Sequence, residues 1–315
     1  MRTTYTVSTS IFLFFSFFLS VQSHAGVCTD CPKKLRNCKG KASMDDGSNY
    51  EGEFRYGLPH GWGTQKWMDG SVYTGEFFEG YRTGHGQQEF ENGDNFSGEW
   101  KGGFMHGKGV YTWTDGSKYV GTFFEGLMEG KGILTLANGE SYDGEWRNGL
   151  SHGTGTYNAE DGSKHFGKYK DGMRNGSGTI TWRTGDVFIG KWKNGKTHKT
   201  GTFQFNNGDK YMCIWEEGEM TGEATYIFVN GREIKGDLKT IERQTAEDEE
   251  LSESVAPNLA LTWYSVAVEQ IRSKNYDAAI ENLKAARSLT TPSSDLNKLI
   301  HQQLEKIKDE ITEGL

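Results

Sequence analysis

Hydrophobic and polar positions alternate along the chain from about residue 39 to residue 240. In one segment Tyr73, Gly75 and Phe77 occupy every second position, and Gly86 and Phe90 continue this spacing beyond a Gly-rich corner. Residues two apart lie on the same face of a β-strand, because successive side chains point to opposite sides. The pattern predicts a β-hairpin with one largely apolar face and one largely polar face.

The hairpin pattern returns every 23 residues without an insertion. Glycines stand at 47, 70, 93, 116, 139, 162, 185, 208 and 231, and a second series runs from Gly57 to Gly218 at the same interval. Strict repetition of a short unit indicates a repeat architecture, in which each unit packs on its neighbours. We therefore expect a mainly β fold: an elongated antiparallel sheet of stacked hairpins, twisted along its length.

Glycines and turn residues refine this expectation. The hairpins are joined by triplets such as Asp-Gly-Ser at 69–71, which favour turns with positive φ. Trp67 and Tyr73 share the apolar face only if an odd number of residues links the strands, so turns of three or five residues are predicted. Gly75 and Gly86 lack a Cβ and are expected to let an aromatic ring lie flat on the backbone. The Gly-rich stretch 80–86 is expected to form the second corner.

The repeated phrase is Tyr/Phe-x-Gly-x-Trp/Phe-x-x-Gly, followed by Gly-x-Gly and Asn/Asp-Gly. It closely resembles the MORN repeat (membrane occupation and recognition nexus) over about 39–238. This span holds a half unit containing Gly40, eight full units and a closing half. Less regular packing is expected in the last units, where the phrase is broken by His165, Lys199, Cys213 and Ala224.

Composition and charge narrow the classes of function. Hydrophobic residues make up 34% of the chain and aromatic residues 13%, and there are 43 glycines. This mixture favours aromatic rings, rather than a large aliphatic core, as the packing units. The net charge of −8 argues against nucleic acid as a partner, because binding to phosphates needs a basic face.

The N-terminus is predicted to be a signal peptide, residues 1–25. Arg2 precedes an apolar run, 11–21, that is short for a membrane span of about 20 residues. Ser23 and Ala25 are the small residues that a signal peptidase reads, so cleavage is expected after Ala25. The chain is therefore expected to be exported to a periplasm, the outside of the cell or an endomembrane lumen. An N-terminal membrane anchor is the alternative.

The leader 26–38 contains Cys28, Cys31 and Cys38, whereas Cys213 stands alone. A disulfide is expected in an exported chain, either Cys28–Cys38 or Cys31–Cys38. The remaining thiol leaves an intermolecular disulfide open. Redox or zinc chemistry at the Cys-x-x-Cys pair is less favoured, because neither a helix N-terminus nor a fourth ligand is visible.

The C-terminal part changes character after the repeats. Residues 239–256 are predicted to be an acidic linker or the solvated start of a helix, and 257–315 a helical region. The pattern from Trp263 to Ala286 is similar to one tetratricopeptide (TPR) unit, although Pro292 falls one residue later than in that family. A plain three-helix cap on the end of the sheet is the other interpretation.

Motifs for catalysis are not visible: the sequence has no P-loop, HExxH or GxSxG. Elsewhere MORN arrays accompany enzyme domains, but too few residues remain here for one. We expect neither an enzyme nor a cofactor. Histidines recur every 46 residues at 60, 106, 152 and 198, but hairpins two apart are about 19 Å apart, too far to share one metal ion.

The sequence therefore predicts an exported scaffold that binds a protein partner or forms a homodimer. Binding to a membrane surface is an alternative, and the best basic patch for anionic lipid consists of Lys191, Lys193, Lys196 and Lys199. Carbohydrate binding by the aromatic rows is a third hypothesis. Protein binding is favoured because repetition makes an extended surface on which no catalytic chemistry is placed.

Overall fold

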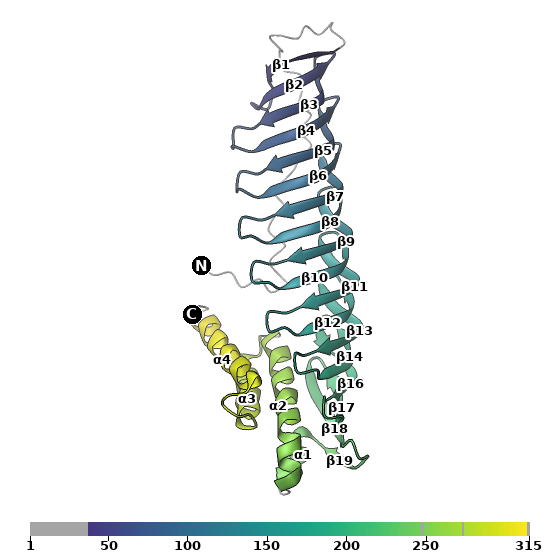
Figure 1. Ribbon diagram of the computed structural model, residues 1–315, viewed down its shortest axis with the longest axis vertical. Helices are drawn as coiled ribbons and strands as arrows, with labels where there is room; N and C mark the ends of the chain where they lie inside the picture. Colours follow the sequence, from purple (N-terminus) through teal and green to yellow (C-terminus); the bar gives the residue numbers. More distant parts are fainter. Residues whose placement is uncertain (1–36, 247–248, 273, 314–315) are drawn as a thin grey trace. The chain divides into compact units, whose positions relative to one another are not determined.

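The computed structural model describes residues 37–246, 249–272 and 274–313. These residues form 19 strands followed by four helices (Figure 1). The strands are β1 (Cys38–Ser43), β2 (Asn49–Arg55), β3 (Leu58–Lys66), β4 (Val72–Phe78), β5 (Tyr81–Glu89), β6 (Asn95–Lys101), β7 (Phe104–Thr112), β8 (Lys118–Phe124), β9 (Leu127–Thr135), β10 (Ser141–Arg147), β11 (Leu150–Asn158), β12 (Lys164–Lys170), β13 (Met173–Thr181), β14 (Val187–Lys193), β15 (Lys196–Thr197), β16 (Lys199–Gln204), β17 (Lys210–Glu216), β18 (Glu219–Ile227) and β19 (Glu233–Gly236). The helices are α1 (Leu238–Ala246), α2 (Glu249–Arg272), α3 (Tyr276–Ser288) and α4 (Asp295–Glu313).

The chain divides into two compact units. Unit 1 contains the described residues up to Tyr157 together with Lys170–Gly172, and unit 2 contains Asn158–Tyr169 and the residues from Met173 onward. In unit 1, strands β1 to β10 pair antiparallel in chain order. In unit 2, strands β13 to β19 pair antiparallel, and β14 contacts both β15 and β16. The predicted fold class, an antiparallel sheet of stacked hairpins followed by helices, is confirmed.

The two kinds of turn differ in length. Five residues, 67–71, link β3 to β4, and the Trp67 amide donates to the Ser71 carbonyl across this turn at 2.9 Å. The odd number agrees with the prediction. At the other corner only Glu79 and Gly80 link β4 to β5, with φ of 49° and 87°, as a tight type I′ turn requires. The second corner is thus smaller than the predicted stretch 80–86, because β5 already begins at Tyr81.

Corner glycines also tie each hairpin to the one before it. The Gly80 amide donates to the Pro59 carbonyl at 2.9 Å, and Gly103 donates in the same way to Arg82 at 2.9 Å. The donor lies 21 residues after the acceptor in both pairs, so each hairpin closes on its predecessor. An isolated two-stranded hairpin is at best marginally stable in water, which explains why the unit is repeated.

In unit 1 a pair of glycines forms the floor beneath the first aromatic ring of each hairpin, such as Tyr73. A Cβ on Gly75 would lie 2.5 Å from the Tyr73 Oη, and one on Gly86 would lie 2.3 Å from it. The Tyr73 ring is edge-on to Phe77 in its own strand and to Trp100 of the next hairpin, with centroids 5.2 and 5.0 Å apart. The prediction that the strand glycines make room for a ring is confirmed.

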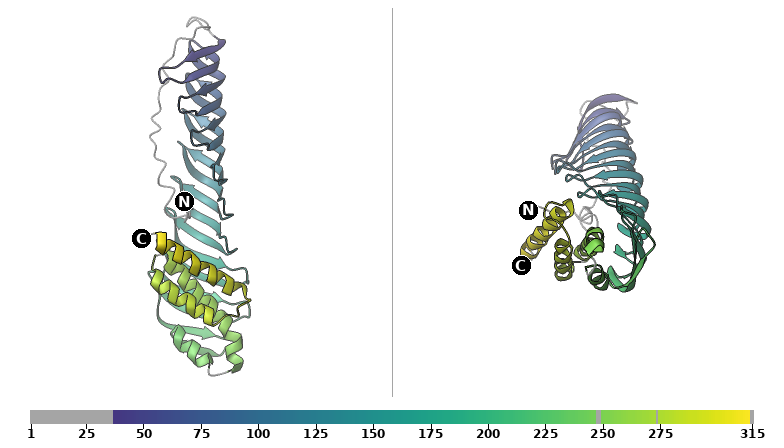
Figure 2. Two further views of the ribbon diagram at one scale, coloured as in Figure 1. Left: turned by 90° about the vertical axis from the view of Figure 1, so that its left-hand side faces the viewer. Right: turned by 60° about the horizontal axis from the view of Figure 1, so that its bottom comes forward.

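In unit 2 the helices lie on one side of the strands (Figure 2). Residues of β14 and of β16 to β19 share one buried cluster with residues of all four helices, including Trp215, Ile241, Leu259 and Leu283. The segment 239–256, expected as a linker or solvated helix start, contains α1 and the first turns of α2, and Pro257 lies inside α2. The helical region is present as expected, and its resemblance to a TPR unit stays a prediction.

Hydrogen bonds fasten α2 to the sheet of unit 2. Asp209 is 3% exposed and accepts from the Tyr226 hydroxyl at 2.7 Å and from the Val229 amide at 2.8 Å. Asn258 of α2 donates to Tyr226 Oη at 2.7 Å and to the Asp209 carboxylate at 3.3 Å. Burial and the neighbouring carboxylate raise the pKa of Tyr226 well above its usual value, so this hydroxyl stays protonated.

Candidate interaction surface

The outer face of unit 1, opposite the aromatic rings, carries a short apolar ladder. Val110, Val120 and Ile133 lie directly opposite one another on β7, β8 and β9. Val120 is 45% exposed and Ile133 44%. The face was predicted to be polar, and in β4 to β6 the same ladder is polar, with Thr74, Gln87 and Ser97. Clustered exposed aliphatic residues on an otherwise polar face are typical of an interaction site. We call these three residues the outer ladder.

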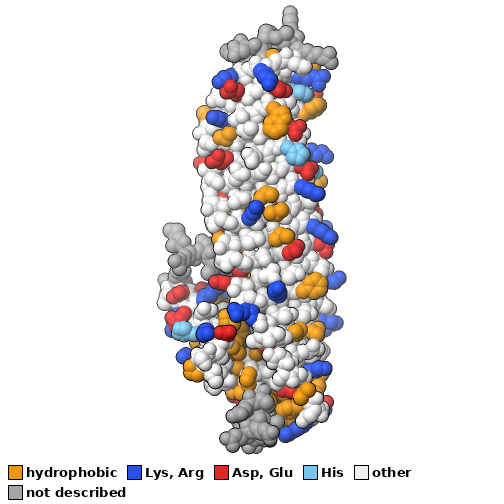
Figure 3. All heavy atoms as spheres, in the orientation of Figure 1, with side chains coloured by type: hydrophobic (Ala, Val, Ile, Leu, Met, Phe, Trp, Pro, Cys, Tyr) orange, Lys and Arg blue, Asp and Glu red, His pale blue; other side chains and the backbone are white. Residues whose placement is uncertain are grey.

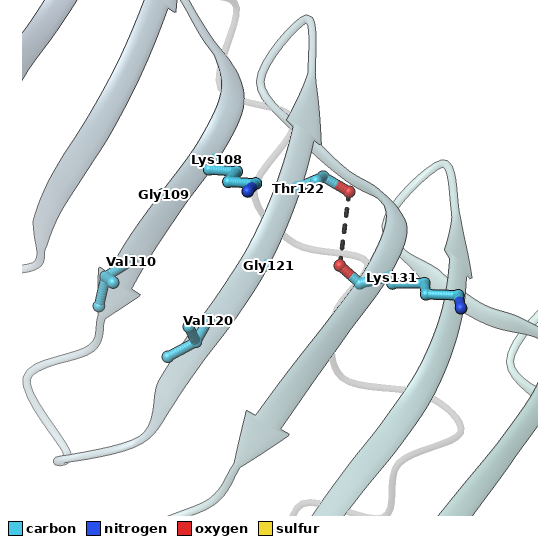
Figure 4. A pocket seen from close by; sticks show the side chains of 7 residues that line it. All are labelled: Lys108, Gly109, Val110, Val120, Gly121, Thr122 and Lys131. Carbon is cyan, nitrogen blue, oxygen red and sulfur yellow. Dashed lines mark hydrogen bonds between the residues drawn. The ribbon is translucent and has the colours of Figure 1, made fainter.

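A shallow hollow lies beside the outer ladder (Figure 4). Its floor contains Gly109 and Gly121, and it is lined by Lys108, Val110, Val120, Thr122 and Lys131. Figure 4 shows the Lys108 side chain directed toward Thr122, and that of Lys131 extending toward the next strand. Thr122 Oγ1 lies 3.4 Å from the Lys131 carbonyl oxygen and also bonds to the Glu129 carbonyl. On the face seen in the space-filling view, hydrophobic, basic and acidic side chains are scattered over a surface that is mostly backbone and other side chains (Figure 3).

The inner face of unit 1 holds a fixed cation. Arg82 lies over the rings of Trp67, Tyr73 and Trp100, with its guanidinium carbon 4.4 Å from the Trp100 centroid. It donates to Gln88 and to a main-chain carbonyl, each at 2.7 Å. Burial lowers the pKa of Arg82 to about 10, so the side chain remains charged at neutral pH. These contacts make Arg82 a packing residue of the aromatic face.

The predicted lysine patch lies within one hairpin of unit 2. Lys193 and Lys196 are direct partners on β14 and β15, and Lys191 is on β14 beside them. The Lys196 ammonium is 3.8 Å from the Glu217 carboxylate. Lys199 has a φ of 62° and pairs with Trp215 of β17. The four lysines therefore gather on β14 to β16, but an acidic residue offsets part of their charge.

Of the predicted cysteine cluster, Cys28 and Cys31 lie outside the described residues. Cys38 begins β1 and is disulfide-bonded, and the choice of its partner stays a prediction. Cys213 is a free thiol, 3% exposed, at a position where unit 1 has a floor glycine. Burial raises the pKa of Cys213 to about 12, so the thiol is protonated and unreactive at neutral pH.

The repeated histidines lie near the hairpin corners. His60 packs on Phe78 and His106 on Phe124, each with centroids 5.2 Å apart. His152 Nδ1 lies 3.6 Å from the Asp171 carboxylate. In the described part of the chain, no three His, Cys, Asp or Glu side chains are grouped so as to hold a metal ion. In the same residues, no helix combines the length and apolarity needed to cross a bilayer.

The outer ladder was not predicted from the sequence. The signal was present: counting in steps of 23 shows that Val110 and Ile133 occupy the column that holds Gln87 in an earlier unit. The role of Thr122 could not be found in this way, because the bulge that it borders is visible only in the strand register.

The fold and its surface define a repeat scaffold built from stacked β-hairpins. Eight segments match the MORN repeat, at residues 50–72, 73–95, 96–118, 119–141, 142–164, 165–187, 188–210 and 214–231. These matches span more than half of the 315 residues, and the chain belongs to the MORN-repeat family. The resemblance inferred from the repeated phrase is confirmed.

No curated protein matches this chain in sequence. Among solved structures, the TCP domain of SAS-4 (dCPAP) from Drosophila melanogaster, in complex with a proline-rich motif of Ana2 (dSTIL), is 12% identical, with a TM-score of 0.30; the match covers 63% of this chain and 88% of that one. The G-box domain of the microcephaly protein CPAP is also 12% identical, with a TM-score of 0.34, covering 56% and 98%. At these TM-scores neither likeness bears on function here.

Proposed function

We propose that the chain is a non-enzymatic, exported repeat scaffold that mediates protein–protein interaction or self-assembly. The outer ladder supports this proposal most directly, because Val120 and Ile133 leave almost half of their surface in water. Burying such side chains against a partner is favourable, at about 25 cal/mol per Å² of apolar surface. Export rests on the sequence of residues 1–25, and cell fractionation with N-terminal sequencing of the mature chain tests it.

Variants of the ladder test the scaffold function. The tagged full-length chain is crosslinked in cells that express it, and adducts are compared with those of Val120→Lys and Ile133→Lys. Thr74→Lys is the matched control, because Thr74 lies on the same outer face, where its partner across the strands, Gln87, is also polar. We expect a discrete hetero-adduct or a homodimer that both ladder variants lose and the control retains. Monomer alone in the wild type, with no adduct, would contradict the proposal.

Binding to an anionic membrane surface is a second candidate, supported by the gathering of Lys191, Lys193, Lys196 and Lys199 in one hairpin of unit 2. Flotation with phosphatidylserine vesicles tests it, and absence from the vesicles at low salt would remove it. The carbohydrate hypothesis gains no support from the aromatic row, because rings such as Tyr73 and Phe96 are fully buried in packing.

A further inference from the structure

In unit 1 a carboxylate occupies the same position in several repeats and caps a bulge in the next strand. The Glu76 carboxylate accepts from the His85 amide at 2.7 Å. Glu99 does the same for Lys108 at 3.0 Å, and Glu145 for Thr154 at 2.9 Å. Each bulge contains a glycine with positive φ just before the capped residue, such as Gly84 at 55°. The bulge amide is therefore a built binding site for a carboxylate oxygen.

Between Glu76 and Glu145 of unit 1, one repeat lacks the carboxylate. Thr122 stands where the neighbouring repeats have Glu99 and Glu145. Gly130 has the same positive φ, 71°, and Lys131 follows it, so the bulge itself is retained. The Thr122 hydroxyl donates to main-chain carbonyls instead. Among the residues that the structure describes, no side-chain acceptor caps the Lys131 amide. The hollow of Figure 4 lies at this position.

Two lysines, Lys108 and Lys131, line the hollow. Lys108 lies directly opposite Thr122, and Lys131 directly opposite Glu145. Neither ammonium group forms an ion pair with a carboxylate of the described residues. The Lys108 ammonium and the uncapped Lys131 amide therefore lie beside a position that holds a carboxylate elsewhere in the unit, whereas the Lys131 side chain extends toward the next strand. Charge-assisted hydrogen bonds to such a group are about twice as strong as neutral ones.

We propose that the hollow binds the carboxylate of an acidic side chain from a protein partner, in place of the glutamate that this repeat lacks. Aliphatic side chains that flank the acidic residue would lie on Val110, Val120 and Ile133. The inference deepens the proposed scaffold function and depends on it. It names the chemistry of the partner: an extended segment in which acidic and aliphatic residues alternate.

An extended peptide fits this surface better than a lipid headgroup does. Glu99 and Glu145, in the same column as Thr122, lie on either side of it along the sheet, and they would repel a flat anionic bilayer. A single side-chain carboxylate reaches the hollow between them. The adjoining outer ladder is apolar, and it suits a strand-like segment whose side chains alternate.

The test uses the isotope-labelled full chain and the blocked peptide Ac-Val-Glu-Val-Glu-Val-NH₂, with its Gln-for-Glu counterpart as the neutral probe. Binding is followed by NMR at the Lys131 and Thr122 amides. We compare the wild type with Thr122→Glu, which supplies the missing carboxylate from within the chain, and with Lys108→Gln combined with Lys131→Gln. Lys118→Gln is the matched control, because Lys118 is an exposed lysine at the far end of β8.

We expect the Glu peptide to shift the Lys131 amide and the Gln peptide to bind at least about tenfold more weakly, as the loss of one charge-assisted bond implies. Thr122→Glu should weaken binding at least about tenfold and raise the melting temperature, and the double lysine variant should weaken it similarly. Lys118→Gln should bind like the wild type.

Equal binding of the two peptides, or undiminished binding to Thr122→Glu, would overturn the proposal. Shifts of the Lys131 amide with inorganic phosphate or phosphatidylserine vesicles, but not with the Glu peptide, would overturn the assignment to a protein partner. A cellular partner that crosslinks equally to the wild type and to Thr122→Glu would refute the hollow as its site and leave the scaffold function standing.

Discussion

Unit 1 and the hairpin β17–β18 of unit 2 use one repeat in two ways, and the difference lies under the aromatic ring. In unit 1 the Tyr73 ring rests on Gly75 and Gly86, and its hydroxyl donates to the Glu76 carbonyl. In unit 2 the glycine pair is kept beneath Phe188, as Gly190 and Gly201, but Cys213 and Ala224 replace it beneath Tyr211. In the described contacts Tyr211 makes no comparable bond to the main chain. A ring lies flat only where the backbone carries no side chain.

The two units also differ in how the sheet is covered. In unit 1 the rings bury one another in an edge-to-face row, so residues such as Tyr73 and Phe96 are fully buried without a second layer of helices in that unit. In unit 2 the strands pack against α2, and a buried network joins Tyr226 to Asn258. The strands of unit 2 are therefore covered by helices as well as by their own rings, such as Phe188 against Trp192.

The largest expected effect on stability comes from removing one of the buried aromatic rings. Tyr73→Ala removes a fully buried ring and its contacts with Phe77 and Trp100, and it should lower the free energy of unfolding by about 3–5 kcal/mol. Trp62→Ala is the control, because Trp62 is 56% exposed, and it should change stability by no more than about 0.5 kcal/mol. Urea denaturation followed by circular dichroism measures the stability of both variants. Equal losses of stability would contradict the structural role of the buried aromatic rings.

The glycine floor gives the sharpest contrast between the units. Gly86→Ala places a Cβ against the Tyr73 ring and should cost about 3 kcal/mol. Ala224→Gly, at the matching position of unit 2, adds room and should cost about 1 kcal/mol, from the greater freedom of the unfolded chain. Thermal unfolding of the two variants measures the difference. If Gly86→Ala left the thermal stability unchanged, the Tyr73 ring would not need the glycine beneath it.

The network that holds α2 should have an intermediate effect. Tyr226→Phe leaves Asp209 and Asn258 without a shared hydroxyl, and it should cost about 1–3 kcal/mol. Hydrogen exchange of the α2 amides should rise in this variant, while amides of β4 and β5 keep their protection. Unchanged exchange in α2 would mean that the network does not fasten the helix.

Alkaline pH should weaken unit 2 through Cys213. Burial raises the pKa of this thiol to about 12, whereas the unfolded thiol ionises near its ordinary value of 9.0. The resulting stability is complete below the unfolded pKa and is lost as pH rises through 9 toward 12. Relative to neutral pH, the total loss should reach about 1.4 kcal/mol at pH 10. Denaturation at several pH values tests this, and Cys213→Ala should flatten that part of the profile.

The bulge caps of unit 1 should give the smallest effect. Glu99→Gln keeps the size of the side chain but removes the charge that accepts from the Lys108 amide, at a cost of about 0.5–1.5 kcal/mol. Lys191→Gln, at the matching position of unit 2, should be neutral, because a lysine cannot accept this bond. Chemical denaturation compares the two, and equal effects would show that the carboxylate does not cap the bulge.

Much of the fold could be predicted from particular residues. The spacing of Tyr73, Gly75 and Phe77 indicated strands, and the parity between Trp67 and Tyr73 indicated the five-residue turn. The two-residue corner and the bulge at Gly84 could not be separated in advance, because glycine with positive φ suits both. The helix through Pro257 was hidden because proline usually marks a helix start. The hollow at Thr122 could not be predicted, because only the strand register shows that Lys108 lies opposite Thr122.

Site-specific photo-crosslinking tests most directly the central claim that the outer ladder of unit 1 contacts a protein partner. A benzophenone amino acid replaces Val120 in the full chain or, as a control, Thr112, which lies on β7 outside the ladder. On irradiation in cells, position 120 should give one adduct of discrete mass and position 112 none. No adduct at 120, or the same adduct from both positions, would contradict the account.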